Sequence, residues 1–333
     1  MLNNCKWNRD GPEQLKLRTF EFCAGPDDSR LKIPRNITKT ELNDSQSGVY
    51  ITNHTFEWNV IEKDFCSVRY PNVKMLIVVH TAISHLATRQ TYREMYGDRF
   101  YEQMGVVTLF FLGMPSDDKE QLQIHNESQT YHDIIQQDFL DTYRNLTWKA
   151  ISWLQYVNEF CEKVEFILKV DDDLVFDLIA IEKYLRRKSP LSDDANVNAN
   201  LILCHVFSGV QHYPVRDEGA KWYVSREEYE PDFYYPYCRG ILYLMSRRTA
   251  VNLLKASIGE KYFWIDDYFI TGHLGHKIGV VFDNIALFDA GEEPMMEGRS
   301  WLTESQDMTE AMNLWKNLEE AHRNASNSIV LWL

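Results

Sequence analysis

The sequence predicts an α/β protein built on a mostly parallel β-sheet. From about residue 73 onward, short and uniformly apolar runs alternate with longer amphipathic segments. Such runs are typical of strands that helices cover on both faces, and the alternation favours parallel pairing through helical crossovers. Three adjacent aspartates follow one run directly, at the strand end where open α/β sheets bind their ligands.

The first half of the pattern is the most regular. Each predicted strand is a short apolar run bounded by polar residues or glycine, and the segment 145–161 has the apolar spacing of an amphipathic helix. The predicted strands are 75–79, 106–112, 133–139 and 164–170, and the predicted helices are 85–96, 117–127, 145–161 and 177–187.

After about residue 200 the pattern becomes mixed. Strands are predicted at 201–206, 241–245 and 278–282, the last of these being the final strand, and helices at 247–257, 263–276 and 304–323. We therefore divide the chain into a polar, stem-like region (1–72), a catalytic domain (73–285) and a C-terminal helical extension (286–333) whose helix packs on the outside.

Composition excludes one class of partner. The 333 residues are 44% hydrophobic and 13% aromatic, which is ample for a buried core. The formal net charge of −14 leaves no surplus of lysine and arginine to displace the counterions of a nucleic acid. Nucleic acid is therefore not an expected partner.

The aspartate triplet Asp171–Asp173 is the leading candidate site. Adjacent carboxylates repel one another, and a hard divalent cation such as Mn²⁺ or Mg²⁺ offsets that repulsion while leaving room for substrate phosphates. We expect Asp173 to be the main metal ligand and Asp171 to face a nucleotide. The alternative is a solvated turn in which Asp173 or Asp177 caps the following helix.

A second acidic pair, Asp266–Asp267, is flanked by aromatic residues. Partial desolvation there would raise a carboxyl pKa and favour a general base. The alternative is a helix N-terminus, where aspartate is favoured by the helix dipole.

Two further segments could contact a ligand. Arg89 and Arg93 are four residues apart on one helix face and could reach a diphosphate, or they could form an intrahelical ion pair or a solvated face. The aromatic turn 234–237 could stack on a sugar ring or could simply pack.

The ordered motifs resemble one family. They are RQTYREMYG (89–97), LFFLG (109–113), YHDIIQQDFLDTYRNLT (131–147), KVDDD (169–173), YPYCRG (235–240) and IDD (265–267). Over about residues 73–285 the chain is similar to the β-1,3-galactosyltransferases and β-1,3-N-acetylglucosaminyltransferases, which are inverting glycosyltransferases.

The resemblance implies a GT-A-type, Rossmann-like fold, Mn²⁺ or Mg²⁺ as cofactor, a UDP-sugar donor and a glycan acceptor on a glycoprotein or glycolipid. It also implies residence in the Golgi as a type II membrane protein. Carried over by position, the roles are as follows: catalytic base, Asp267; metal ligands, Asp173 and Asp171; donor binding, Arg89, Arg93, Asp171 and Asp172; acceptor or sugar pocket, Tyr237, Gly240 and Asp266.

The resemblance therefore predicts a hexosyltransferase that moves galactose or N-acetylglucosamine to an acceptor hydroxyl in β-1,3 linkage with inversion. The family's Gly-rich stretch is replaced here by bulkier residues at 239–242, which motivates a catalytically silent glycan- or nucleotide-binding homologue as the alternative. An acidic, secreted structural protein is a third hypothesis.

The sequence says less about the cellular compartment of the protein than about its fold. The six cysteines include no CxxC pair, and their even number permits disulfides without fixing the pairing. N-x-[ST] motifs occur at Asn36, Asn43, Asn53, Asn126, Asn145 and Asn324. No apolar stretch approaches the ~18–20 residues that span a bilayer, so membrane attachment would need a targeting segment not evident in the sequence.

Overall fold

The computed structural model describes residues 49–52, 56–188, 200–208, 212–284, 295–296, 300–305 and 307–327. These ranges belong to one compact unit spanning Asp44–Leu333. Most of the predicted stem-like region, together with Cys5, Cys23 and the motifs at Asn36, Asn43 and Asn53, lies outside the described residues.

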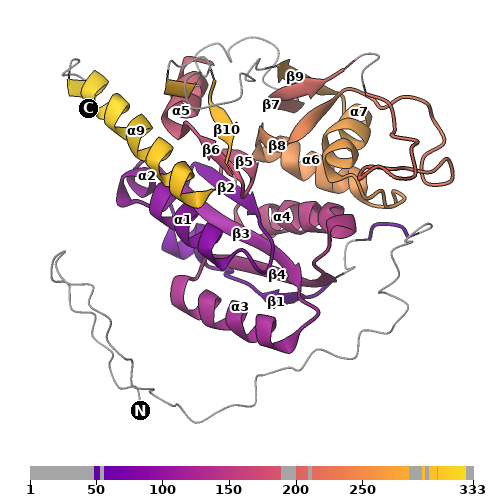
Figure 1. The fold of residues 1–333 in the computed structure, drawn as a ribbon, viewed down its shortest axis with the longest axis horizontal. Coiled ribbons are helices and arrows are strands. Elements are labelled where there is room, and N and C mark those ends of the chain that lie inside the picture. Colours follow the sequence, from indigo (N-terminus) through magenta and orange to yellow (C-terminus); the bar gives the residue numbers. More distant parts are fainter. Residues whose placement is uncertain are drawn as a thin grey trace. The chain divides into compact units, whose positions relative to one another are not determined.

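A mixed sheet organises the described part of the chain (Figure 1). Its eight strands run in the order β1 (Trp58–Val60), β4 (Ile134–Leu140), β3 (Val106–Met114), β2 (Met75–His80), β5 (Phe166–Asp171), β8 (Tyr237–Ser246), β7 (Asn200–Phe207) and β9 (Val280–Asn284). Strands β2 to β5 pair in parallel, whereas β8 is antiparallel to both β5 and β7. The predicted parallel sheet with a mixed C-terminal half is confirmed.

Helices cover both faces because the central strands are apolar on both. Leu76 and Val78 of β2 belong to one core with α4 (Leu146–Phe160) and α6 (Arg247–Ser257). Ile77 and Val79 belong to a second core with α1 (Leu86–Tyr96) and α9 (Met308–Asn327). The remaining helices are α2 (Arg99–Gln103), α3 (Asp118–Tyr131), α5 (Leu178–Lys188), α7 (Gly275–Lys277), the 3₁₀ turn Tyr143–Asn145 and the π-helical segments Phe65–Arg69 and Tyr268–Leu274.

The predicted helices and strands occur within a few residues of their expected bounds, but short elements were missed. A two-stranded sheet joins β6 (Leu174–Phe176) to β10 (Leu302–Glu304) in antiparallel fashion. The prediction that 278–282 forms the final strand is therefore wrong. Strands of three residues are too short to establish an alternating pattern, which is why β1, β6 and β10 left no signal.

Packing continues beyond the boundaries drawn from composition. N-terminal to residue 73, β1 pairs with β4, and a disulfide joins Cys66 to Cys161 at the end of α4. On the C-terminal side, Leu314 and Trp315 of α9 are buried in the core that contains α1. The changes at residues 72 and 285 are thus changes in sequence pattern and not ends of the packed unit. No helix of the described residues is long and apolar enough to span a membrane.

Candidate active site

The candidate site lies where the parallel strands end and the antiparallel strand β8 begins. His80, the last residue of β2, pairs in register with Asp171, the last residue of β5. Because β8 runs antiparallel to β5, its N-terminal half brings Gly240 to the same edge. The acidic triplet and the glycine of the YPYCRG motif, separated by 67 positions in the numbering (240 − 173), thus meet.

A buried lysine connects these two segments. Lys169 Nζ donates to Asp171 Oδ1 at 2.5 Å and to the Gly240 carbonyl at 2.6 Å. The side chain is only 2% exposed, so its ammonium depends on these partners for the hydration it has lost. Lys169 was not among the predicted site residues, although a lone lysine inside the apolar run 164–170 was a signal that could have identified it.

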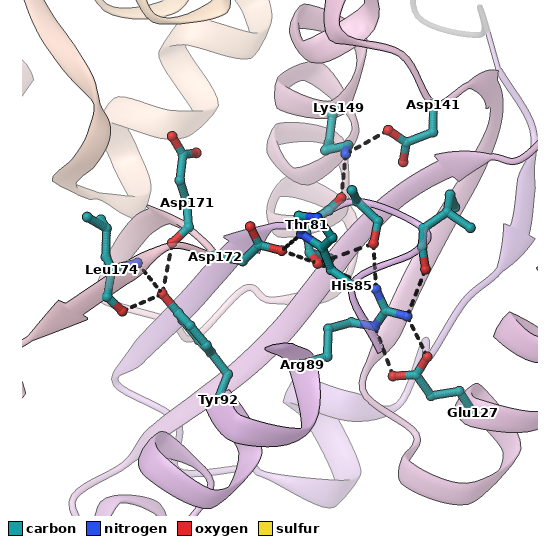
Figure 2. A network of polar contacts seen from close by, with 12 residues as sticks. Thr81, His85, Arg89, Tyr92, Glu127, Asp141, Lys149, Asp171, Asp172 and Leu174 are labelled. Atoms are coloured by element: carbon teal, nitrogen blue, oxygen red, sulfur yellow. Dashed lines mark hydrogen bonds and ion pairs between the residues drawn. The ribbon is translucent and has the colours of Figure 1, made fainter. Parts of the chain in front are cut away.

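The three aspartates of the triplet have three different environments. Asp171 contacts Lys169, and although its side chain is 37% exposed, partial desolvation raises its pKa to about 6. Asp172 accepts a hydrogen bond from Thr81 Oγ1 at 2.6 Å and contacts His85 Nδ1 at 2.7 Å, as Figure 2 shows. Asp173 has a buried Oδ1 with no hydrogen-bond partner, and burial together with the Asp172 charge raises its pKa.

Tyr92 holds the backbone of the acidic turn (Figure 2). Its hydroxyl lies 2.9 Å from the Asp171 carbonyl and 2.7 Å from the Leu174 carbonyl, and it accepts a hydrogen bond from Leu174 N–H at 3.2 Å. The single hydroxyl proton of Tyr92 is shared between the Asp171 and Leu174 carbonyls. The Tyr92 side chain therefore connects the two ends of the acidic turn. Tyr92 lies inside the RQTYREMYG motif, yet only the flanking arginines were predicted to be functional.

Arg89 supports the loop that follows β2 instead of lying on a solvated face. It is 1% exposed, forms a bidentate pair with Glu127 at 2.9 and 2.7 Å, and donates to the carbonyls of Ala82 at 2.6 Å and Ile83 at 3.2 Å (Figure 2). That loop carries Thr81 and His85, the two partners of Asp172.

Arg93 and Lys149 complete this buried polar network. Arg93 pairs with Glu127 at 2.8 Å and with Asp133 at 2.8 Å. Lys149 of α4 donates to the Thr81 carbonyl at 2.6 Å and to Asp141 at 3.0 Å. The proposed intrahelical pairing and solvated face of the arginines are both wrong, because their carboxylate partners lie on α3 and at the start of β4. Their direct contact with a donor stays a prediction.

The second acidic pair is half-buried beside the triplet. Burial, reinforced by the Asp266 charge, raises the pKa of Asp267 to about 7. Burial also raises the pKa of Asp266, whose Oδ2 lies 3.8 Å from Nδ1 of the fully buried His80. Asp267 Oδ1 accepts from Tyr268 N–H at 2.7 Å, so the carboxylate also caps the π-helical segment that follows. The helix-terminus alternative and the desolvated carboxyl group are both observed.

Gly240 allows β8 to approach this pair. A Cβ atom at Gly240 would lie 2.9 Å from Asp267 Cβ and 3.2 Å from its Oδ2, which is closer than carbon atoms tolerate. Tyr237, by contrast, is buried and packs edge-on against Phe207 and Tyr268. Its ring therefore packs within an aromatic cluster, as the packing alternative for the aromatic turn expected.

Exposed aromatic residues flank the acidic pair. Burial, with a smaller contribution from the charges of Asp266 and Asp267, raises the pKa of Tyr143. Tyr143 Oη accepts a hydrogen bond from Trp222 Nε1 at 2.6 Å, and both rings are about half exposed. Neither was singled out by sequence analysis, although Tyr143 lies within the motif 131–147.

A divalent cation fits the acidic turn. Within the described ranges, no group of three or more His, Cys, Asp or Glu side chains is arranged to hold a metal by itself. The buried Asp173 Oδ1, however, lacks any partner, and a carboxylate oxygen of this kind is the ligand that Mn²⁺ and Mg²⁺ prefer. Asp173 and Asp171 could supply a partial ligand set that substrate phosphates and water complete.

Several known proteins are similar to this chain in sequence. The β-1,3-galactosyltransferase 1 proteins of Mus musculus and Homo sapiens are 29% identical over 231 residues, which is 69% of this chain and 68% of theirs. Human β-1,3-galactosyltransferase 5 is 30% identical over 197 residues, or 59% of this chain and 61% of its own.

Similar solved structures include a glycosyltransferase involved in glycosylation of the major capsid of PBCV-1. It has 8% identity and a TM-score of 0.36 over 73% of this chain and 98% of that one. The apo structure of the bifunctional glycosyltransferase WbbM has 10% identity and a TM-score of 0.38 over 76% of this chain and 52% of its own.

The family assignment rests on a family model that matches most of the predicted catalytic domain. The family model described as galactosyltransferase matches residues 87–285, more than half of the chain, and covers every predicted site residue. The predicted α/β fold of GT-A type and the predicted glycosyltransferase activity agree with this match and with the sheet topology. The chain therefore belongs to the galactosyltransferase family of hexosyltransferases.

Proposed function

We propose that this enzyme transfers galactose from UDP-galactose to a glycan hydroxyl in β-1,3 linkage, with inversion at the anomeric carbon. N-acetylglucosamine is the second donor candidate. One observation carries the proposal: Lys169 and Gly240 bring the desolvated carboxyl group of Asp267 to the acidic turn Asp171–Asp173. A base and a diphosphate site so placed are what a single displacement needs.

In that displacement, Asp267 accepts the proton of the acceptor hydroxyl as its oxygen attacks the anomeric carbon. The bond to the acceptor oxygen forms while the bond to the diphosphate oxygen breaks, and UDP departs. A carboxyl pKa of about 7 suits this role because a general base is most effective when its pKa lies near the working pH.

Asp173 and Asp171 are the residues that would hold Mn²⁺ or Mg²⁺ with the donor. A bound cation supplies positive charge to the departing diphosphate. Asp172, Arg89 and Arg93 are better assigned to positioning, because their observed partners fix the β2–α1 loop and its contact with the turn.

The exposed rings of Tyr143 and Trp222 favour a pyranose acceptor, since sugar rings pack their C–H faces on aromatic side chains. This acceptor would be a glycan on a glycoprotein or glycolipid. The disulfides Cys66–Cys161 and Cys204–Cys238 support an oxidising compartment such as the Golgi lumen. Asn126 is exposed for glycosylation, whereas Asn145 is buried and donates to the Leu140 carbonyl.

The test is a donor screen that reads UDP release with and without Mn²⁺, followed by the variant Asp267→Asn. We expect the variant to lose transfer while UDP–Mn²⁺ affinity stays within about twofold, because Asp267 acts on the acceptor proton and not on the nucleotide. Asp117→Asn, which removes an exposed carboxylate charge at the start of α3 but keeps an oxygen that can cap the helix, is the matched control and should retain activity. Loss of UDP affinity in Asp267→Asn would contradict the assigned role, and UDP binding without transfer from any UDP-sugar would favour a silent homologue.

A further inference from the structure

An ion pair between Arg239 and Glu304 lies against the acidic turn. Arg239 directly precedes Gly240 in β8, and its guanidinium pairs with the Glu304 carboxylate at the end of β10. Glu304 is opposite Leu174 in the small sheet, and the next residue, Ser305, donates its N–H to the Asp173 carbonyl at 2.8 Å. Two segments outside the triplet therefore place one cation and one further carboxylate beside it.

The effect of the Glu304 charge on Asp173 shows that the Arg239–Glu304 pair lies close to the acidic turn. The Glu304 charge is one of the causes that raise the pKa of Asp173, after burial and Asp172. Lys169 is committed to Asp171 and to the Gly240 carbonyl and is almost completely buried. Arg239, whose side chain is 33% exposed, and Glu304, at 49%, can instead be reached from solvent.

The Arg239–Glu304 pair is also suited to an exchange in which another anion replaces Glu304 as the partner of Arg239. Partly exposed ion pairs add little net stability, so exchanging one anion for another costs little. A guanidinium fork fits phosphate oxygens as well as it fits a carboxylate, and it does so with two parallel hydrogen bonds. A diphosphate carries more negative charge than the single carboxylate that it would replace.

We propose that Arg239 binds the diphosphate of the donor and that Glu304 is the anion it contacts when no donor is bound. Donor binding would then break the Arg239–Glu304 pair, and Glu304 would act as a competitor of the nucleotide. This inference rests on the proposed UDP-sugar transfer but adds a residue and a competing anion to it.

The test compares UDP with uridine, which lacks the diphosphate, by calorimetry on the whole chain with and without Mn²⁺. Arg239→Gln should weaken UDP binding about tenfold or more, the range of a charge-assisted hydrogen bond, and leave uridine binding within about twofold. Glu304→Gln should tighten UDP binding about threefold, because it removes the competing charge. Arg186→Gln removes the cation of an exposed pair with Glu182 on α5 and should change neither affinity.

The outcomes separate this inference from the proposed function. If the wild type binds UDP and Arg239→Gln binds it equally well, the inference is wrong and the transferase proposal stands. Weaker UDP binding in Glu304→Gln would also overturn it, since Glu304 would then support the nucleotide or its cation. If the wild type binds no UDP under either condition, both proposals fail.

Discussion

Removing the ammonium of Lys169 is the sharpest single perturbation of this site. Lys169→Met keeps most of the side chain's length and apolar stem, but it leaves the Asp171 carboxylate and the Gly240 carbonyl without their shared donor. The Lys169 charge also favours the ionised forms of Asp266 and Asp267. The variant therefore removes the one cation whose charge acts on all three of these carboxyl groups, and Asp266 alone retains the weaker influence of Lys149.

The expected loss of unfolding free energy in Lys169→Met follows from the burial of the Lys169–Asp171 ion pair. Removing one partner of a buried ion pair costs about 3–5 kcal/mol, because the other charge is left uncompensated. Asp171 is 37% exposed, so water takes over part of its solvation and places the expected loss near the lower end, about 3 kcal/mol. For a packed unit of this size that corresponds to a fall in melting temperature of roughly 5 °C.

The stability that Lys169→Met loses should depend on pH. A carboxyl group with a raised pKa in the folded state keeps its proton there while the unfolded chain releases it. Its contribution to stability is present below the unfolded pKa and is lost as pH rises through the folded pKa. For Asp171 and Asp267 the wild-type window runs from the ordinary value of 3.8 to about 6 and about 7. Without Lys169 the window extends to higher pH, so the deficit should be larger at about pH 8 than at about pH 5.

Urea unfolding of the wild type, Lys169→Met and Lys163→Met at the two pH values measures this deficit. Lys163 is exposed at the end of α4, and its variant should match the wild type. Equal deficits at both pH values, or a loss below about 1 kcal/mol at the higher one, would show that the carboxyl groups do not depend on this lysine.

Three further predictions address the same site and its scaffold. The transfer rate, measured as kcat/KM from about pH 5 to about pH 9, should rise through about pH 7 and then level off, because Asp267 accepts a proton only when ionised. Gly240→Ala should lower kcat at least about tenfold, because the new methyl group lies 2.9 Å from Asp267 Cβ and displaces that carboxyl group. The same clash should cost about 1–3 kcal/mol in urea unfolding. Gly219→Ala, on an exposed turn, is the control. Replacing Cys66 and Cys161 together by alanine should cost about 2–4 kcal/mol of unfolding free energy, because this disulfide closes a separation of 95 residues.

Local patterns predicted the regular elements well. The helix expected at 247–257 coincides with α6, because Ser246 accepts a hydrogen bond from Thr249 N–H and so fixes its first turn. The strand and turn around the aspartate triplet were equally clear, since an apolar run ends at charged residues. The three-residue strands β1, β6 and β10 depend on partners far away in the sequence, and no local signal marks them.

The roles of individual charged residues were harder to predict. Arg89 and Arg93 were correctly placed on one helix face, but their partner Glu127 follows Arg89 by 38 positions on another helix. Whether such a face meets solvent, a ligand or a carboxylate is decided by the packing of α1 against α3. The role of Glu304 could not be predicted from the sequence either, because β10 lies next to the acidic turn through its pairing with the distant strand β6.

The surroundings of the triplet explain how the fold can hold three consecutive carboxylates. Lys169 offsets the charge of Asp171 from within its own strand, and Thr81 and His85 offset that of Asp172 from the loop after β2. Asp173 alone keeps a buried oxygen without a partner. A buried carboxylate oxygen without a partner is costly, and within the triplet this cost falls on Asp173, where a cation would remove it. It follows that Asp173→Asn should weaken Mn²⁺-dependent UDP binding far more than Asp172→Asn, whose main effect should be a looser β2–α1 loop.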